Sequence, residues 1–327
     1  MAIGPGPTRR TALAWPLALG LSACAASPET DPSSTPEPAS AAPADAAFGN
    51  FTGLSESVHS GVASPDGEQR LTVRLCRYPG LGLSWIWVHA RTPAGFFSFV
   101  DHLAPCEPTP TPDGGTDALY TDARRVISLR RLGLVSKPTS ATATGSVMAH
   151  RETTSRFGAG AHKLDFTIAF TPERLYSGLN VGRTEVFGNT AASVTVDGTR
   201  FDIAGPAQFH EQRQTNPRFV VPFTYSSLWG EDSGGTLLVT AARRDGYLLE
   251  GDRTTEVEGV TIGPRAPRRA IDLRLADGRA VSGEARTVQA FTIPIVGSVW
   301  RGHMITADLG GRRYHGTLND HPGTGPA

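Results

Sequence analysis

From Phe48 onward, the sequence has a two-residue period, in which every second side chain falls on the same face of an extended strand. In residues 83–90 this alternation places four side chains on one face of a strand: Leu83, Trp85, Trp87 and His89. Similar segments cover residues 96–103, 164–170 and 219–229. No long stretch has the 3.6-residue period of an amphipathic helix. The sequence therefore predicts an all-β fold with few short helices.

Two-residue turn signals separate these segments. Asp-Gly and Gly-Gly pairs favour the type I′ turns that join neighbouring antiparallel strands. Such pairs occur at Asp66-Gly67, Asp197-Gly198, Asp245-Gly246, Asp277-Gly278 and Gly310-Gly311. The spacing predicts meandering antiparallel sheets, which at this length close into barrels or pack as sandwiches and so protect their edges.

One interruption suggests a domain boundary within the β region. Ala204-Gly205-Pro206-Ala207 separates two strand-like segments and combines the two strongest breakers of regular structure. We therefore predict an N-terminal β domain over residues 48–203 and a C-terminal β domain over residues 204–320. A frayed tail is expected at residues 321–327.

The first residues resemble the export signal of a bacterial lipoprotein. Arg9 and Arg10 precede an apolar run over residues 12–20, and Leu21-Ser22-Ala23-Cys24 resembles a lipobox. The apolar run is too short to cross about 30 Å of hydrocarbon as a helix. We predict a signal peptide over residues 1–23 and lipidation of Cys24, with an ordinary signal peptide as the alternative. The arginine pair also resembles a twin-arginine export signal.

Residues 25–47 have the composition of a linker. They are mostly Ala, Ser, Thr and Pro, with four acidic residues and no basic or aromatic ones. Such a segment buries too little apolar surface to offset its ordering entropy. Residues 24–47 are therefore expected to be a lipidated cysteine followed by a disordered linker. It would tether the body to the cell membrane or outer membrane, on its periplasmic or extracellular face.

Composition argues against several classes of partner. Lys and Arg together number 31, as do Asp and Glu, so the formal net charge is zero and nucleic-acid binding is not expected. The nine histidines show neither His-x-His nor His-x-x-x-His spacing, and there is no Cys-x-x-Cys. We expect a monomer with no metal and no cofactor.

Two local motifs need interpretation. Asp232-Ser233-Gly234-Gly235 resembles the nucleophile segment of chymotrypsin-like proteases, but it lacks the preceding glycine, and no histidine lies in an Ala-Ala-His-Cys context. We interpret it as a hairpin turn. Cys76 and Cys106 could form a disulfide worth about 3 kcal/mol in the chain-entropy model. Two buried thiols are the alternative, because sequence does not give their Cα separation.

Several short segments together resemble a known family. They are Ser84 to His89, Phe97 to Asp101, Gln208 to Gln212, Phe291 to Pro294 and Trp300 to His303. They resemble the lipocalin-like superfamily that includes carotenoid 1,2-hydratases, kievitone hydratase and AttH-like secreted proteins. The resemblance implies two tandem antiparallel lipocalin-like barrels, or strongly curved sandwiches. A small apolar ligand would occupy a cavity between or inside them.

The resemblance also implies candidate site residues. The family's hydratases add water to a prenyl double bond, which requires an acid to protonate the alkene, aromatic faces to stabilise the cation and a positioned water. Glu211 or Asp101 would be the acid, and His210 would orient the water. The ligand would be lined by Trp85, Trp87, His89, Phe223, Tyr225 and Trp229.

Strand geometry limits this assignment, and two functional hypotheses stay open. His210 and Glu211 point to opposite faces of an ideal strand, so both enter one site only at a bulge or turn. One hypothesis is an enzyme that hydrates, cyclises or isomerises an apolar, isoprenoid-like molecule. The other is a non-catalytic carrier of lipid or another hydrophobic ligand.

Overall fold

The computed structural model describes residues 53–106, 117–176, 182–215, 218–219, 221–240, 244–295 and 298–323. In these residues every regular element is a β-strand except one 3-10 turn, η1 (Pro79–Leu81). The all-β prediction is confirmed. The predicted signal peptide, Cys24 and the linker lie outside the described residues. No helix in the described part of the chain is long and apolar enough to cross a membrane.

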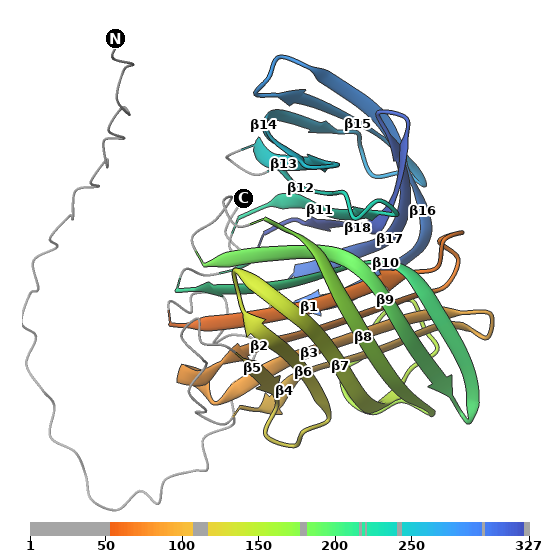
Figure 1. Ribbon diagram of the computed structural model, residues 1–327. Helices are drawn as coiled ribbons and strands as arrows, with labels where there is room; N and C mark the ends of the chain where they lie inside the picture. Colours follow the sequence, from red (N-terminus) through yellow and green to blue (C-terminus); the bar gives the residue numbers. More distant parts are fainter. Residues whose placement is uncertain are drawn as a thin grey trace, which may run out of the picture. The chain divides into compact units, whose positions relative to one another are not determined.

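The N-terminal half forms one curled antiparallel sheet of ten strands, which resembles half of a barrel (Figure 1). Its strand order is β4-β3-β2-β1-β10-β9-β8-β7-β6-β5. The strands are β1 (Ser55–Ala63), β2 (Arg70–Tyr78), β3 (Leu83–Thr92), β4 (Gly95–Pro105), β5 (Ala118–Thr121), β6 (Ile127–Leu134), β7 (Lys137–Ala149), β8 (His162–Tyr176), β9 (Arg183–Val196) and β10 (Thr199–Gln214). The first and last strands in sequence, β1 and β10, thus lie side by side in the middle of the sheet.

The C-terminal half forms a closed antiparallel barrel of eight strands, in which β18 pairs with β11. The strands are β11 (Phe223–Gly230), β12 (Gly235–Thr240), β13 (Arg244–Glu250), β14 (Arg253–Ile262), β15 (Arg268–Leu275), β16 (Ala280–Ile295), β17 (Ser298–Leu309) and β18 (Arg312–His321). The predicted pair of tandem curved β units is therefore present, and of the two only the second closes completely.

The curled sheet ends with β10 at Gln214, and the barrel begins with β11 at Phe223. The boundary predicted between Ile203 and Ala204 falls inside β10, which pairs with β9 without a break. Gly205 and Pro206 lie just beyond the last paired residue of β1, so β10 is bound only on its β9 side there. A Cβ on Gly205 would lie 2.2 Å from the carbonyl oxygen of Ala63. The glycine therefore serves close backbone approach rather than a domain break.

Four of the five predicted turn pairs lie between consecutive strands, as expected. Asp245-Gly246 does not, because it lies within β13. Gly246 pairs with Leu238 of the neighbouring strand, and a Cβ on it would lie 2.1 Å from the carbonyl oxygen of Leu237. Here too the glycine permits close approach of two strands. The predicted tail also begins one residue too early, since His321 ends β18.

Each sheet has its own apolar core, and further apolar clusters join the two sheets. The curled sheet buries side chains such as Val58 and Phe209 on its inner face, and the barrel buries side chains such as Leu228 and Leu238. Trp85, Trp87, Phe291, Ile293 and Trp300 belong to a joining cluster. The barrel therefore packs its outer side against the face of the curled sheet that is opposite the sheet's core.

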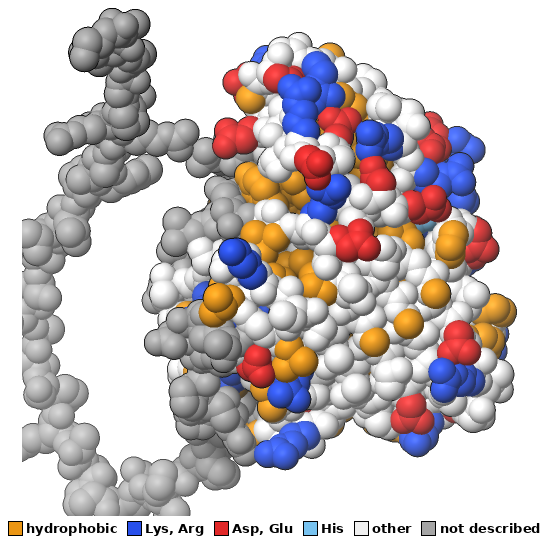
Figure 2. Space-filling view, viewed as in Figure 1, with side chains coloured by type: hydrophobic (Ala, Val, Ile, Leu, Met, Phe, Trp, Pro, Cys, Tyr) orange, Lys and Arg blue, Asp and Glu red, His pale blue; other side chains and the backbone are white. Residues whose placement is uncertain are grey.

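The charged side chains on the surface shown in Figure 2 are of both signs, as expected for a formal net charge of zero. Figure 2 shows Lys and Arg mixed with Asp and Glu over the barrel, and few charged side chains over the middle of the curled sheet. No surface of a single sign of charge dominates this face. A cavity lies between the two sheets.

Candidate functional site

A cavity of about 260 Å³ lies between the curled sheet and the barrel. Its floor comes from β1, β2, β3, β9 and β10, and its roof from β11, β12, β16, β17 and β18. The aromatic residues of the roof are Phe223, Tyr225, Phe291 and Trp300, and its aliphatic residues are Leu237 and Val239. This position agrees with the expectation of a cavity between two β units.

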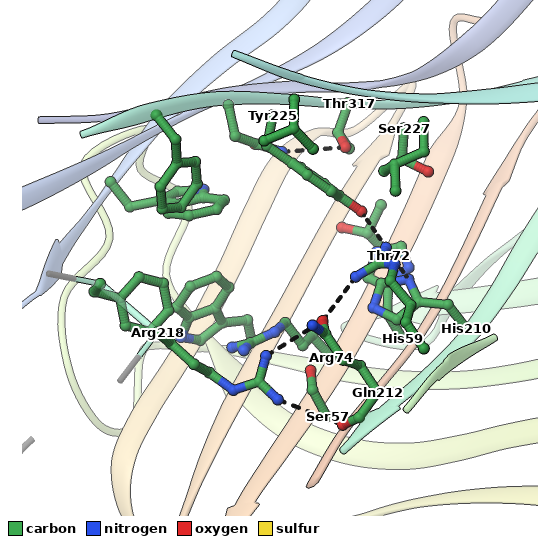
Figure 3. A pocket seen from close by; sticks show the side chains of 18 of the residues that line it. Ser57, His59, Thr72, Arg74, His210, Gln212, Arg218, Tyr225, Ser227 and Thr317 are labelled. Carbon is green, nitrogen blue, oxygen red and sulfur yellow. Dashed lines mark hydrogen bonds between the residues drawn. The ribbon is translucent and has the colours of Figure 1, made fainter. Parts of the chain in front are cut away.

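The floor is organised by strand register. One row of directly paired residues runs across five strands from Trp87 through Arg74, His59 and His210 to Glu185. Directly paired residues of antiparallel strands point to the same face, so these side chains lie side by side. Figure 3 shows Arg74, His59 and His210 together in the cavity.

Two further rows flank this one. Trp85, Cys76, Ser57, Gln212 and Arg183 pair across the same five strands on one side. On the other side, the row from His89 to Phe187 contains Gly61. A Cβ on Gly61 would lie 2.9 Å from the ring of Trp229, so this glycine makes room for a barrel side chain.

A buried hydrogen-bond network surrounds Arg183. Its guanidinium donates to Glu185 at 2.5 Å, to the hydroxyl of Tyr225 at 2.6 Å and to Gln212 at 2.8 Å. Tyr247 of the barrel donates to the same Glu185 carboxylate. Because Arg183 and Glu185 belong to β9 while the tyrosines belong to the barrel, this network fixes the two sheets against each other at one end of the cavity.

The cavity histidines are neutral at neutral pH. Burial lowers the pKa of His59 to about 4 and that of His89 to about 3. Burial, followed by the charge of Arg183, holds the pKa of His210 well below its ordinary value. His59 Nδ1 donates to Gln208, whose amide donates to His210 Nδ1, each at 3.0 Å. The two imidazole rings stack with centroids 5.0 Å apart.

The structure brings five of the predicted site residues into this cavity. They are Trp87, His89, His210, Phe223 and Tyr225. Trp85 and Trp229 are fully buried beside it and do not line it. Trp85 stacks on His102 and Phe219, and Trp229 packs over Gly61. Both tryptophans therefore contribute to the packing around the cavity and not to its lining.

The two predicted acids lie elsewhere. Glu211 points to the opposite face of β10 from His210 and accepts a hydrogen bond from Arg131 at 2.6 Å. Asp101 pairs with Arg124 at 2.5 Å and accepts the backbone N–H of Leu103. No bulge in the pairing of β10 turns Glu211 inward, because its register with β1 and β9 is unbroken. Among the described residues, no Asp or Glu lines the cavity.

Four basic residues of the cavity were not predicted as site residues from the sequence: His59, Arg74, Arg183 and Arg218. The alternation in β2 shows on which face Arg74 lies. In β2, Leu71, Val73 and Leu75 alternate with Thr72, Arg74 and Cys76, and the second set is the face that the barrel covers. Because Arg70 and Thr72 share that face, it has the composition of a solvent-exposed one, and only the position of the barrel shows that Arg74 faces the cavity.

The remaining motifs have structural roles. Ser233 and Gly234 lie in the turn between β11 and β12, where Ser233 has a φ of 55° and its hydroxyl donates to Glu173. This agrees with the hairpin interpretation. Cys76 and Cys106 are both buried, and no disulfide joins them within the described residues. Among the residues that the structure describes, no group of three or more His, Cys, Asp or Glu side chains is arranged so that it could hold a metal ion.

Comparisons with known proteins reveal a shared fold. No protein-family model and no curated protein matches the sequence. An AttH protein from Nitrosomonas europaea matches with a TM-score of 0.54 and 12% identity over 88% of this chain and 98% of that chain. CghA, solved with Sch210972, matches with a TM-score of 0.55 and 10% identity over 83% and 89%. Kievitone hydratase from Nectria haematococca gives 0.44 and 10% over 84% and 90%. The first two matches confirm the predicted fold resemblance.

Proposed function

We propose that this protein is a cell-envelope lipoprotein that binds one apolar, isoprenoid-like molecule in the cavity between its two sheets. The observation that carries the proposal is the aromatic lining on both sides, with Trp87 in the floor and Phe223, Phe291 and Trp300 in the roof. Ligand cavities of this kind are mostly apolar, with a few placed polar groups, and measure roughly 300–1,000 Å³. A cavity of about 260 Å³ suits a single compact ligand.

The shared fold supports a ligand-binding role. CghA, which has the same fold, was crystallised with Sch210972. In the present chain, the position of the cavity between two independently cored sheets gives a ligand apolar walls on both sides without opening either core. Binding therefore requires no rearrangement of the two β units' interiors.

Alkene hydration is the less favoured form of catalysis. Protonating an isolated alkene requires a carboxylic acid against the substrate, and the described lining residues include no Asp or Glu. Glu185 lies behind Arg183, which pairs with it, and it also accepts from Tyr247. Glu185 does not line the cavity, so its carboxylate does not face a ligand bound there.

Cyclisation or isomerisation is the second candidate function, and Tyr225 is the observation that favours it. Its hydroxyl accepts from Arg183 at 2.6 Å at the cavity wall. Burial raises the pKa of Tyr225, so the phenol stays protonated at neutral pH. A neutral phenol polarised by a guanidinium can donate a hydrogen bond to a substrate carbonyl and stabilise developing negative charge.

One experiment separates the carrier from the enzyme. The full chain, purified after export and incubated with a host lipid extract, would be analysed by native mass spectrometry and solvent extraction. We expect a stoichiometric apolar ligand that is recovered unchanged. An isomer, or a product one water heavier, would favour the enzyme, and Tyr225→Phe should then abolish turnover while retaining binding. Leu134→Ala, at an exposed position, serves as the control for Tyr225→Phe. Failure to recover any ligand from the wild type would refute the binding proposal.

Anchoring through Cys24 is tested separately. Cells producing the full chain or Cys24→Ser would be labelled with an alkyne fatty acid and fractionated. We expect the wild type to carry the label and sediment with membranes. The variant should lose both properties, because acyl chains on this cysteine supply the membrane affinity. A labelled variant, or an unlabelled wild type, would contradict lipidation at Cys24.

A further inference from the structure

The cavity is rich in positive charge. Three arginines line it, Arg74, Arg183 and Arg218, and the described lining residues include no carboxylate. The three lining histidines are neutral at neutral pH because burial lowers the pKa of each. Glu185, behind the lining, compensates one arginine by pairing with Arg183. The guanidinium charges of Arg74 and Arg218 are therefore left without a carboxylate in the lining.

Arg74 and Arg218 are partly buried, and they differ from most of the fully buried arginines among the described residues. Of the five buried arginines among the described residues, four pair directly with carboxylates: Arg77 with Glu56, Arg131 with Glu211, Arg183 with Glu185 and Arg269 with Asp320. The fifth, Arg70, donates to the backbone carbonyls of Ile305 and Gly316. Within the described residues, no carboxylate lies within 4.0 Å of Arg74 or Arg218. A buried charge is costly unless an opposite charge or hydrogen bonds compensate it.

The partners of these two arginines are neutral and incomplete. Arg218 donates to the hydroxyl of Ser55 at 2.9 Å and makes longer contacts of 3.4 Å with Gln212. The guanidinium of Arg74 lies 4.4 Å from the centre of the Trp87 ring, and its Nη1 is buried with no hydrogen-bond partner among the described residues. Burial lowers the pKa of Arg218, and the positive charges of Arg74 and Arg183 act in the same direction.

The two arginines occupy one side of the cavity. Figure 3 shows Arg218 and Arg74 near Gln212 and Ser57, with Tyr225 on the opposite side. Trp87, over which Arg74 stacks, begins the aromatic part of the lining. A ligand with an acidic group at one end would place that group at the arginines and its apolar body against the aromatic walls.

We propose that the cavity selects apolar monocarboxylates, whose carboxylate is bound by Arg74 and Arg218. This inference rests on the proposed function, since it names the class of ligand for the same cavity. A carboxylate supplies the charge partner that both guanidiniums lack and accepts hydrogen bonds in the planar geometry that guanidinium groups offer. A neutral alcohol of the same skeleton leaves both charges uncompensated.

The test uses the full chain and matched pairs of ligands. Farnesoic acid is compared with farnesol, and geranic acid with geraniol, by tryptophan-fluorescence titration and isothermal calorimetry at pH 7.5. We expect each acid to bind at least about tenfold more tightly than its alcohol, as charge-assisted hydrogen bonds in a buried site imply. Arg74→Gln and Arg218→Gln should each reduce that preference, whereas the matched control Arg274→Gln, on the exposed barrel surface, should leave it unchanged.

The outcomes distinguish this inference from the proposed function. Equal affinity for acid and alcohol, or tighter binding of the alcohol, would overturn the carboxylate assignment and leave apolar binding intact. Binding of neither member of either pair would refute both. An acid preference that survives in the double variant Arg74→Gln/Arg218→Gln would show that other groups bind the carboxylate. The wild-type comparison alone remains decisive if the double variant does not fold.

Discussion

Replacing His89 with phenylalanine should make the protein less sensitive to acid. His89 lies in the floor of the cavity, 3% exposed, with its ring centroid 4.2 Å from that of Phe291 and 6.0 Å from that of Phe96. Its Nε2 has no hydrogen-bond partner within the described residues. A phenylalanine keeps the aromatic stack and removes the titratable group.

The size of the effect follows from the pKa of His89, which burial lowers from 6.5 to about 3. Because the folded-state pKa is lowered, the stability contributed by neutral His89 is complete above about pH 6.5 and is lost as the pH falls toward 3. Between pH 6.5 and pH 5.0 the unfolded chain takes up a proton that the folded chain refuses. At about 1.36 kcal/mol per pH unit, this costs the wild type about 2 kcal/mol of unfolding free energy.

The assay is urea unfolding of wild type and His89→Phe at several pH values from 7.5 to 5.0. The difference in unfolding free energy should change by about 2 kcal/mol in favour of the variant across that range. Any packing cost of the larger ring shifts the variant equally at every pH. Phe291→Leu disturbs the same stack without removing a titratable group, so its difference from the wild type should stay constant. A constant difference for His89→Phe as well would refute the assignment of a neutral buried imidazole.

Three other changes test the packing between the sheets and the position of the predicted acid. Gly61→Val should destabilise the protein by about 1–3 kcal/mol in urea unfolding, because its Cβ would meet the Trp229 ring at 2.9 Å; Gly259→Ala, with contacts of 3.5 Å or longer, should cost less. Arg70→Met should lower the thermal midpoint by an amount equivalent to about 1–3 kcal/mol, because Arg70 donates to the Ile305 and Gly316 carbonyls of the barrel at 2.7 and 3.1 Å; an unchanged midpoint would contradict this role. Glu211→Gln should cost roughly 1.5–3 kcal/mol of stability by weakening the pair with Arg131, yet leave ligand affinity unchanged; a loss of affinity in titrations would place Glu211 in the site after all.

The sequence was sufficient to predict the strands and some of the cavity-facing side chains. The alternation in residues 83–90 correctly placed Trp87 and His89 on one face, because side-chain direction in a strand depends only on parity. The same parity rule separated His210 from Glu211, and the unbroken register of β10 confirms that separation. The resemblance to hydratases suggested Glu211 as the acid. The alternation of side chains along β10 shows that Glu211 faces away from the cavity.

The arginines could not be assigned from sequence, for a different reason. Arg183 and Arg218 follow no local pattern that distinguishes them from surface arginines, and their burial depends on a barrel formed by later residues. The partner of Glu211 lies 80 residues earlier, on a strand that does not neighbour its own. Gly205-Pro206 was misleading because the same residues serve either a domain break or the end of a neighbouring strand.

The floor of the cavity depends on the pairing of β1 with β10, which joins the two ends of the curled sheet's sequence. His59 and His210 are direct partners in that pairing, although about half of the chain separates them. A shift of one residue in the register of β1 against β10 would pair His59 with Phe209, so one of the two strands would turn its apolar side chains toward the barrel and its polar ones into the core. Core packing therefore enforces the register that builds the site. Arg74 and Arg183 join the same floor through the next strands, β2 and β9. The site therefore forms only when the first strand has paired with the tenth, and a short segment of the sequence cannot carry a motif for it.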